Sequence, residues 1–409
     1  MNEEYIRSDL QRLAEGRPPR SARILQKVTT GISFLTDFLS EQYLDFYIPA
    51  GGSKIKFLTG RRGTGKTHFT NLFRTQAEEK NFLTVSFSAT DVWLHDFREV
   101  YLEILRQCDL KEILENCAAQ IIREMEFDPD EIHPGQTFMD YLSENNEADA
   151  LTKNILRGEL RRRFSRNPLL DHTFADCCSL LVGGILGHPV LEPASREMIM
   201  DFLHGDKTVK LSQMRAIGLS PTRVNKYNAR HMLRSLAEIV QMAGYAGIMI
   251  VIDDLEVLQR RSTDQPIRYT KMRREDAYES IRQLIDDIDS MRYILFLVSF
   301  DRELIDNESY GLKSYQALWF RIQNEVIGIK FNRFADIIDM DRLSDQIYTA
   351  EVLMEMSEKL ALVCSSADRP LSPLSREQAE ELIERSRYGG IGLPYLVNRM
   401  LLEGGTQNG

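Results

Sequence analysis

The sequence predicts an α/β fold, with a parallel five-stranded sheet flanked by helices, a large helical insertion and a helical C-terminal region. Three observations support this fold class. Short runs rich in β-forming residues alternate with stretches whose apolar residues follow a helical period. Residues 248–252 and 291–300 are apolar almost throughout, which is typical of parallel strands covered on both faces. The run at residues 55–58 leads into a glycine-rich turn and then a helix, as in the strand–turn–helix units of parallel sheets.

The composition is that of an ordinary globular protein. The 409 residues allow two or three domains, or one domain with large insertions, and 43% are hydrophobic and 27% charged. The net charge of −10 disfavours a chain covered with nucleic-acid-binding surface, although a local basic patch is compatible with it. Five scattered cysteines without a C-x-x-C pair indicate a reducing compartment and disfavour a zinc site.

Nothing in the sequence predicts attachment to a membrane. The charged N-terminus has no apolar core and so does not resemble a signal peptide. The longest weakly polar run, residues 180–191, is too short to span a bilayer. We therefore expect a cytoplasmic protein.

The first strand is preceded and followed by helical segments. Residues 1–50 are predicted to be mainly helical, and the turn at 49–52 leads into the strand. A second short strand is predicted at residues 81–89. Helical patterns then follow one another from residue 91 to residue 231 without a convincing strand, which predicts a helical insertion or subdomain.

The turn after the first strand carries the most specific motif. Residues 60–67 read GRRGTGKT and satisfy G-x-x-x-x-G-K-[ST] at every fixed position. Glycines let successive backbone N–H groups point inward around an anion, and the following helix adds its N-terminal N–H groups and dipole. The alternative is a glycine-rich turn with a solvated lysine, but the flanking strand and helix favour a phosphate-binding loop. The residues predicted to bind nucleotide are Gly60, Arg61, Arg62, Gly63, Thr64, Gly65, Lys66, Thr67 and His68.

An acidic residue ends the apolar strand at residues 248–252. A carboxylate at the tip of a buried strand is costly unless it meets a cation or hydrogen-bond donors. Asp253 is therefore predicted to coordinate Mg²⁺ together with the Thr67 hydroxyl, and Asp254 or Glu256 to orient the attacking water. The alternative for the acidic pair is a helix N-cap, and the phosphate-binding loop favours the metal.

The rest of the chain completes the predicted sheet and adds a lid. The strand at residues 291–300 places Ser299 near its tip, where a sensor residue would contact the γ-phosphate or the attacking water. A helix at 311–322 carries Arg321, and a fifth strand is predicted at 325–331. From residue 342 onward the sequence is predicted to be helical.

These patterns divide the chain into five segments. They are an N-terminal helical segment at 1–50, the first part of the core at 51–90, a helical insertion at 91–231, the second part of the core at 232–335 and a C-terminal helical lid at 336–409.

The order of motifs resembles that of P-loop NTPases of the AAA+ class, near the initiator and origin-recognition clade. Longer strings, GGSKIKFLTGRRGTGKTHF and AGYAGIMIVIDDLE among them, resemble the BREX-system ATP-binding proteins of bacterial phage defence. The resemblance covers most of residues 25–400 and is thinner before about residue 200. It implies binding of ATP and Mg²⁺, ATP hydrolysis, and work on or near DNA with other subunits of a defence system.

Two positions depart from the pattern that the resemblance implies. A glutamate usually follows the first aspartate of the acidic strand, and here Asp254 stands there, one methylene shorter. Either slower water activation or a larger role for Glu256 would follow. Tyr395 stands after Pro394, where a lid arginine that contacts the phosphates is expected, and Arg399 is a weak substitute.

Three further signals remain open between a functional and a structural interpretation. Arg321 is either an arginine finger that completes a neighbouring subunit's site, which would require a homo-oligomer, or a surface arginine. The basic clusters Arg157–Arg166 and Arg260–Arg274 either contact DNA or are solvated faces. Residues 210–233 have the look of a helix-turn-helix, but their likeness to a family string favours a structural role.

Two functions from different classes fit these observations. The first is an ATP-driven AAA+ motor or switch in a phage-defence assembly. The second is a nucleotide-gated signalling or scaffold protein that turns over little ATP and recruits an effector without binding DNA. Asp254 and the acidic composition favour the second slightly, and the family resemblance favours the first.

Overall fold

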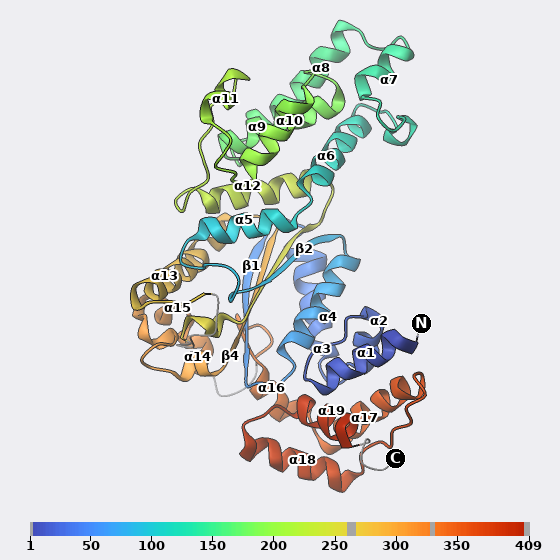
Figure 1. The fold of residues 1–409 in the computed structure, drawn as a ribbon, viewed down its shortest axis with the longest axis vertical. Coiled ribbons are helices and arrows are strands. Elements are labelled where there is room, and N and C mark those ends of the chain that lie inside the picture. Colours follow the sequence, from blue (N-terminus) through green and yellow to red (C-terminus); the bar gives the residue numbers. More distant parts are fainter. Residues whose placement is uncertain (1–2, 260–266, 328–331, 405–409) are drawn as a thin grey trace. The chain divides into compact units, whose positions relative to one another are not determined.

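The computed structural model describes residues 3–259, 267–327 and 332–404. Five strands form one parallel sheet in the order β2-β3-β4-β1-β5, flanked by helices (Figure 1). The strands are β1 (Ser53–Gly60), β2 (Phe82–Ser88), β3 (Gly247–Asp253), β4 (Ile294–Asp301) and β5 (Ile337–Asp339). The α/β class and the parallel five-stranded sheet predicted from the sequence are therefore confirmed.

Four strands lie where the sequence predicts them, and two of these are buried along nearly their whole length. Every residue of β3 except Asp253, and every residue of β4 except Asp301, is buried. The apolar runs correctly indicated strands covered on both faces. β4 lies between β1 and β3, so the strand that leads into the glycine-rich loop and the strand that ends in Asp253 are not direct neighbours.

The predicted position of the fifth strand is wrong. Residues 325–327 end the helix α15 (Gln316–Ile327), and residues 328–331 lie outside the described residues. The fifth strand is β5, which pairs in parallel with β1 and places Leu58 opposite Ile338. Its three residues are too few to leave a strand pattern in the sequence, and the buried Leu318 and Ile322 continue a helical period instead.

The chain forms two compact units. The first comprises Met1–Asp91, Met249–Ile288 and Leu295–Gly409, and the second comprises Val92–Ile248 and Asp289–Ile294. The helices of the first unit are α1 (Glu3–Ala14), α2 (Ala22–Val28), α3 (Ser33–Leu39), α4 (Lys66–Glu79), α13 (Lys271–Asp287), α14 (Glu303–Asp306), α15, α16 (Met340–Ile347), α17 (Ala350–Ser365), α18 (Arg376–Gly389) and α19 (Leu393–Gly404).

The second unit is helical, apart from the first residues of β3 and of β4. Its helices are α5 (Phe97–Gln107), α6 (Leu110–Glu124), α7 (Phe138–Glu144), α8 (Ala150–Leu160), α9 (His172–Leu186), α10 (Pro193–Leu203), α11 (Leu211–Ala216) and α12 (Ala229–Met242). Side chains of α6, α9 and α12 form much of its buried interior, including Cys117, Cys177 and Cys178. These cysteines are packing residues, and burial raises the pKa of each of their thiols.

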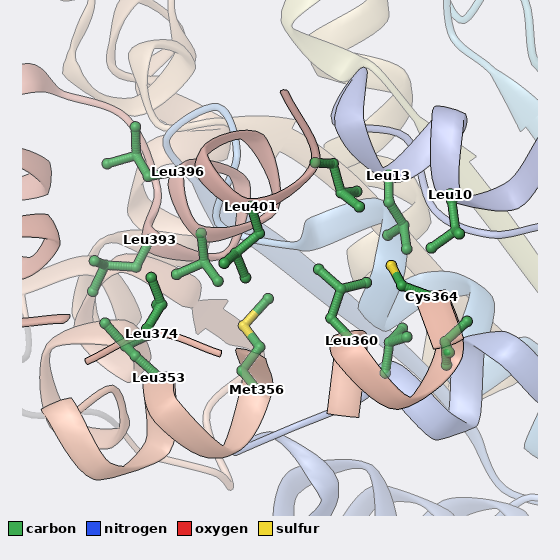
Figure 2. Close-up of a cluster of buried hydrophobic side chains, with 14 of the residues drawn as sticks. Leu10, Leu13, Leu353, Met356, Leu360, Cys364, Leu374, Leu393, Leu396 and Leu401 are labelled. Carbon is green, nitrogen blue, oxygen red and sulfur yellow. The ribbon is translucent and has the colours of Figure 1, made fainter. Parts of the chain in front are cut away.

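The two ends of the chain share one hydrophobic core in the first unit. Leu10 and Leu13 of α1 face Leu360 and Cys364 of α17, and Leu401 of α19 lies beside them (Figure 2). The sequence predicts the N-terminal segment and the C-terminal lid as separate parts. Their amphipathic helices bury their apolar stripes against each other, so together they form one helical bundle.

Candidate functional site

The glycine-rich loop joins β1 to the N-terminus of α4. Gly63 and Gly65 have φ values of +84° and +91°, a left-handed conformation that favours glycine, and Gly65 is the N-cap of α4. A Cβ atom on Gly60 would lie 2.7 Å from Oγ1 of Thr64, whose hydroxyl donates to the carbonyl of Arg61. The glycines of the motif are therefore required by the curl of the loop itself.

A cavity of about 450 Å³ lies over this loop, within the size range of small-ligand sites. It is lined by Leu13, Gly16, Arg17, Pro18, Val28, Thr30, Ile32, Arg62, Gly63, Thr64, Gly65, Lys66, Thr67, His68, Asp254, Glu256, Ser299, Asp301, Tyr348, Met356, Leu360, Pro394, Tyr395 and Asn398. Seven of the nine residues predicted to bind nucleotide are among them. The loop and the strand ends supply most of its polar residues, and the helices of the two chain ends supply apolar ones such as Leu13 and Leu360.

Lys66 is surrounded by oxygen atoms. Its ammonium donates to the carbonyls of Gly60 and Arg61, at 2.7 and 3.2 Å, and to Oδ1 of Asp301 at 2.6 Å. The side chain of Lys66 is 13% exposed and that of Asp301 is 30% exposed. An anion that enters the loop must therefore compete with Asp301 for the lysine.

Asp253 and Ser299 lie at the ends of adjacent strands. The Ser299 hydroxyl donates to Oδ1 of Asp253 at 2.5 Å. Burial raises the pKa of the Asp253 carboxyl, and this hydrogen bond together with the charges of Arg74 and Lys66 opposes the shift. The predicted sensor residue thus directly contacts the predicted metal ligand.

The two candidates for orienting water differ in their surroundings. Asp254 has a left-handed backbone (φ +60°), and its carboxylate accepts a 2.7 Å hydrogen bond from Ser88 at the end of β2. Glu256, in the 3₁₀ turn Leu255–Leu258, is 5% exposed, and its Oε2 accepts from the backbone N–H of Asp301 at 3.2 Å. Both line the cavity, so the structure brings together the two carboxylates that the sequence left as alternatives.

Gly60 and Arg61, the first two residues of the loop, do not line the cavity and instead connect the loop to neighbouring elements. Asp341 of α16 accepts from the backbone N–H of Arg61 at 3.0 Å and from its guanidinium at 2.8 Å. Arg302, directly after β4, donates to Asp339 at 2.6 Å and its backbone N–H donates to the carbonyl of Gly60. Gly60 and Arg61 are not lining residues, and these bonds anchor the loop to the ends of β4 and β5 instead.

The C-terminal helices close directly onto the loop. The backbone N–H of Gly392 donates to the carbonyl of Arg62 at 2.9 Å, and that of Tyr395 donates to the carbonyl of Gly63 at 3.2 Å. A Cβ atom on Gly392 would lie 2.3 Å from backbone atoms of Gly63 and Thr64. The loop and the C-terminal helices are therefore in main-chain contact, with no room for a side chain at Gly392.

His68 contributes a neutral imidazole to the same wall. Burial lowers its pKa to about 4. Its Nε2 lies 2.8 Å from Oγ1 of Thr29, and the Thr29 hydroxyl donates to the carbonyl of Leu25. His68 is thus the donor to Thr29, which links α4 to the end of α2.

Sequence reasoning missed Asp301 and the contribution of the N-terminal segment. Side chains alternate along a strand, so Asp301, two residues after Ser299, lies on the same side of β4. This spacing could have identified Asp301 from the sequence. Arg17 and Thr30, which line the cavity, carry no motif. Only the packing of the N-terminal helices against the C-terminal helices brings them to the loop.

The two arginines singled out in the sequence are ion-paired outside the cavity. The guanidinium of Arg321 donates to Asp286 of α13 at 2.8 and 3.3 Å, and its side chain is 45% exposed. Arg399 pairs with Glu403 one turn along α19 at 2.7 Å. Neither lines the cavity within this chain.

Among helices in the described part of the chain, none combines the length and apolar character that crossing a bilayer requires.

The chain was compared with known proteins. No curated protein matches the chain, and no solved structure matches it. A protein-family model described as "BREX system ATP-binding protein BrxC/D" matches residues 3–398, nearly the whole chain.

Proposed function

Because the chain belongs to the family of BREX system ATP-binding proteins, we propose that it binds ATP with Mg²⁺ over the glycine-rich loop and hydrolyses it. It would act as a motor or switch in a bacterial anti-phage defence complex, with an AAA+ core formed by the sheet. The observation that carries this proposal is the loop geometry. Left-handed Gly63 and Gly65, the start of α4 and the Lys66 ammonium converge on one cavity.

The residues around the loop suit a magnesium–nucleotide complex. Thr67 is exposed at the first turn of α4 and lines the cavity. Asp253, which is half-buried, supplies a carboxylate whose pKa is raised by desolvation, so a cation beside it would be stabilising. We propose that Thr67 and Asp253 hold Mg²⁺, which would neutralise charge that develops on the phosphates.

The protein's own groups would then perform three tasks. Lys66 exchanges Asp301 for the phosphate oxygens. Ser299 keeps the Asp253 carboxylate oriented through its hydrogen bond. Glu256 or Asp254 holds the attacking water as hydrogen-bond acceptor, and both line the cavity.

The lid couples this site to the rest of the molecule in the proposed cycle. The backbone N–H groups of Gly392 and Tyr395 donate to carbonyls of the loop. A change in loop conformation would therefore shift α19 and the hydrophobic core that α19 shares with α1 and α17. The division into core, insertion and lid is part of this proposal.

A homo-oligomer is also part of this proposal. In it, Arg321 would leave Asp286 and act as an arginine finger in the site of a neighbouring subunit.

We also propose that the protein is cytoplasmic and that it associates with DNA and with other subunits of the defence system. In the cluster Arg157–Arg166, Arg162 and Arg163 are paired with Glu159 and Glu124, while Arg157, Arg161 and Arg166 are exposed. In the cluster Arg260–Arg274, residues 260–266 lie outside the described residues, and Arg274 stacks on Tyr310. Exposed arginines of either cluster would meet DNA phosphates.

One observation favours the second function, a low-turnover switch that recruits an effector. Asp254 is held by Ser88 in a left-handed backbone, which costs on the order of 1 kcal/mol for a residue other than glycine. Such a residue is a poor candidate for a mobile base. If Asp254 is the acceptor that limits turnover, Asp254→Glu should raise kcat, and if Glu256 serves, Asp254→Glu should leave kcat unchanged.

The deciding experiment measures ATP binding and steady-state hydrolysis on the full chain, with and without duplex DNA. The proposal expects Mg²⁺-dependent turnover that Lys66→Ala abolishes, and DNA stimulation would support the motor. Tight ATP binding with negligible turnover would select the switch. Failure of the wild-type chain to bind ATP, under conditions where it is folded, would overturn both.

A further inference from the structure

The second unit contains an unusual stretch of positive charge. Residues 207–237 include seven lysines and arginines and no aspartate or glutamate, although 61 of the 409 residues of the chain are acidic. Several acidic residues would be expected in a stretch of this length. The stretch covers the connection from α10 through α11 to most of α12 (Figure 1).

Within the described part of the chain, the exposed positive side chains of this stretch have no acidic partner. Lys207, Lys210, Arg215 and Lys226 are exposed, and among the described residues none of the four is ion-paired. Their charges are therefore available to a ligand. By contrast, Arg162 and Arg163 of the neighbouring cluster each contact two glutamates.

Hydrogen bonds to the main chain order the backbone that carries these charges. The Arg223 guanidinium donates to the carbonyls of Asp206 and Val209, which ties the two arms of the connection together. The backbone N–H of Thr222 donates to Thr173 of α9 at 3.0 Å. A cationic surface that is already ordered loses less conformational entropy when it binds.

An exposed aromatic ring lies in the same stretch of the chain. Tyr227 is 83% exposed, and its backbone N–H is fixed by Oδ1 of Asn225 at 2.9 Å. The ammonium of Lys226 lies 5.0 Å from the centre of the ring. An exposed tyrosine beside a lysine can stack on a base while the lysine meets a phosphate.

We propose that residues 207–228 form a nucleic-acid-binding surface that grips the phosphodiester backbone through Lys207, Lys210, Arg215 and Lys226, with Tyr227 stacking on an unpaired base. The hydroxyl and amide side chains of Thr208, Ser212, Gln213 and Thr222 add the small polar donors that accompany phosphate contacts. The exposed ring favours nucleic acid over an acidic protein. The inference deepens the proposed association with DNA and does not depend on ATP hydrolysis.

The test is binding of the full chain to short fluorescent DNA, duplex and single-stranded, over roughly 50 to 200 mM salt. The triple variant Lys207→Ala, Arg215→Ala, Lys226→Ala should weaken binding on the order of tenfold and flatten the logarithmic salt dependence by about three units, one for each lost phosphate contact. Tyr227→Ala should weaken single-strand binding more than duplex binding, whereas Tyr227→Phe should not.

A matched control removes the same charge from the same unit. Arg106, Lys111 and Arg162 are exposed, and each is ion-paired with a glutamate, so their triple alanine variant should bind DNA almost as wild type does. All variants should keep wild-type helicity and ATP affinity, which shows that they fold.

Three outcomes overturn the assignment. If the wild-type chain binds neither form of DNA at low salt, the proposed DNA association fails as well. If it binds DNA but the Arg157→Ala, Arg161→Ala, Arg166→Ala variant loses binding and the first triple variant does not, only the placement fails. If poly-glutamate binds as tightly as single-stranded DNA, the surface recognises an acidic polypeptide instead.

Discussion

The Lys66 ammonium and the Asp301 carboxylate lie 2.6 Å apart across the mouth of the glycine-rich loop. Asp301 follows the last buried residue of β4, and its backbone N–H is bound by Glu256. Asp301 is thus ion-paired with Lys66, the side chain that is proposed to bind the phosphates. Any ligand phosphate must replace a carboxylate that already occupies the lysine.

Replacing Asp301 should therefore tighten nucleotide binding. Asp301→Asn removes the competing charge, and a partly exposed ion pair of this kind is worth up to about 1 kcal/mol, so the Kd for ATP should fall by roughly threefold to fivefold. Equilibrium titration with a fluorescent ATP analogue measures it. Asp306→Asn, which removes a more exposed carboxylate near Arg302, is the matched control and should leave Kd unchanged. Weaker binding in Asp301→Asn would mean that Asp301 supports the ligand instead of competing with it.

A side chain at Gly392 should separate the lid from the loop. A Cβ atom there meets backbone atoms of Gly63 and Thr64 at 2.3 Å, and overpacking against main chain costs about 1 to 3 kcal/mol. Gly392→Ala should weaken ATP binding by roughly tenfold, mainly through faster dissociation measured by stopped flow. Gly389→Ala offers the control, because nothing lies within 4 Å of its added Cβ. Equal dissociation rates in the two variants would show that lid contact does not retain nucleotide.

The loop, four strands and the acidic tip could be predicted because each is encoded locally. Residues 60–67 carry a complete motif, and the β3 and β4 runs are apolar enough to be recognised without their neighbours. The three residues of β5 gain their strand conformation only from pairing with β1. Local patterns cannot reveal an element whose stability comes from a partner 280 positions away in the chain, as Leu58 is from Ile338.

The walls of the cavity could not be predicted for a related reason. Leu13 and Leu360 line it together because α1 and α17 share a core, and amphipathicity shows only that each helix has an apolar face. It does not show which faces meet. Asp301 is a different case, because strand alternation alone places it on the same side of β4 as Ser299.

His68 should make the fold sensitive to acid. Its pKa in the folded chain is about 4, below the usual value near 6.5, so below pH 6.5 the unfolded chain takes up a proton that the folded chain does not. The stabilisation from a neutral His68 is complete above pH 6.5 and is lost as the pH falls toward 4. His68→Gln keeps a donor for Thr29 and does not titrate. Its melting temperature should fall less between pH 7 and pH 4.5 than that of wild type, whereas His133→Gln, at an exposed position, should behave as wild type does.

Ser299 should control the protonation of the proposed metal ligand. Burial raises the pKa of Asp253, and the hydrogen bond from Ser299 opposes that shift, so Ser299→Ala should raise the pKa further. A carboxyl must lose its proton to hold Mg²⁺, and the acid limb of the pH–rate profile for ATP hydrolysis should therefore move to higher pH. Ser299→Thr, which keeps the hydroxyl, should restore the limb.

The same variant separates positioning of Asp253 from a direct role of Ser299 at the phosphates. If Ser299 acts only through Asp253, excess Mg²⁺ should recover much of the activity of Ser299→Ala at high pH, where the carboxyl is ionised in both proteins. If Ser299 is a sensor that contacts the γ-phosphate or the attacking water, kcat should stay low at every pH and Mg²⁺ concentration while the acid limb remains in place. Because β4 lies between β1 and β3, a residue at its end could act either on Asp253 or at the phosphates. The position of the acid limb reports the first role, and kcat at high pH and high Mg²⁺ concentration reports the second.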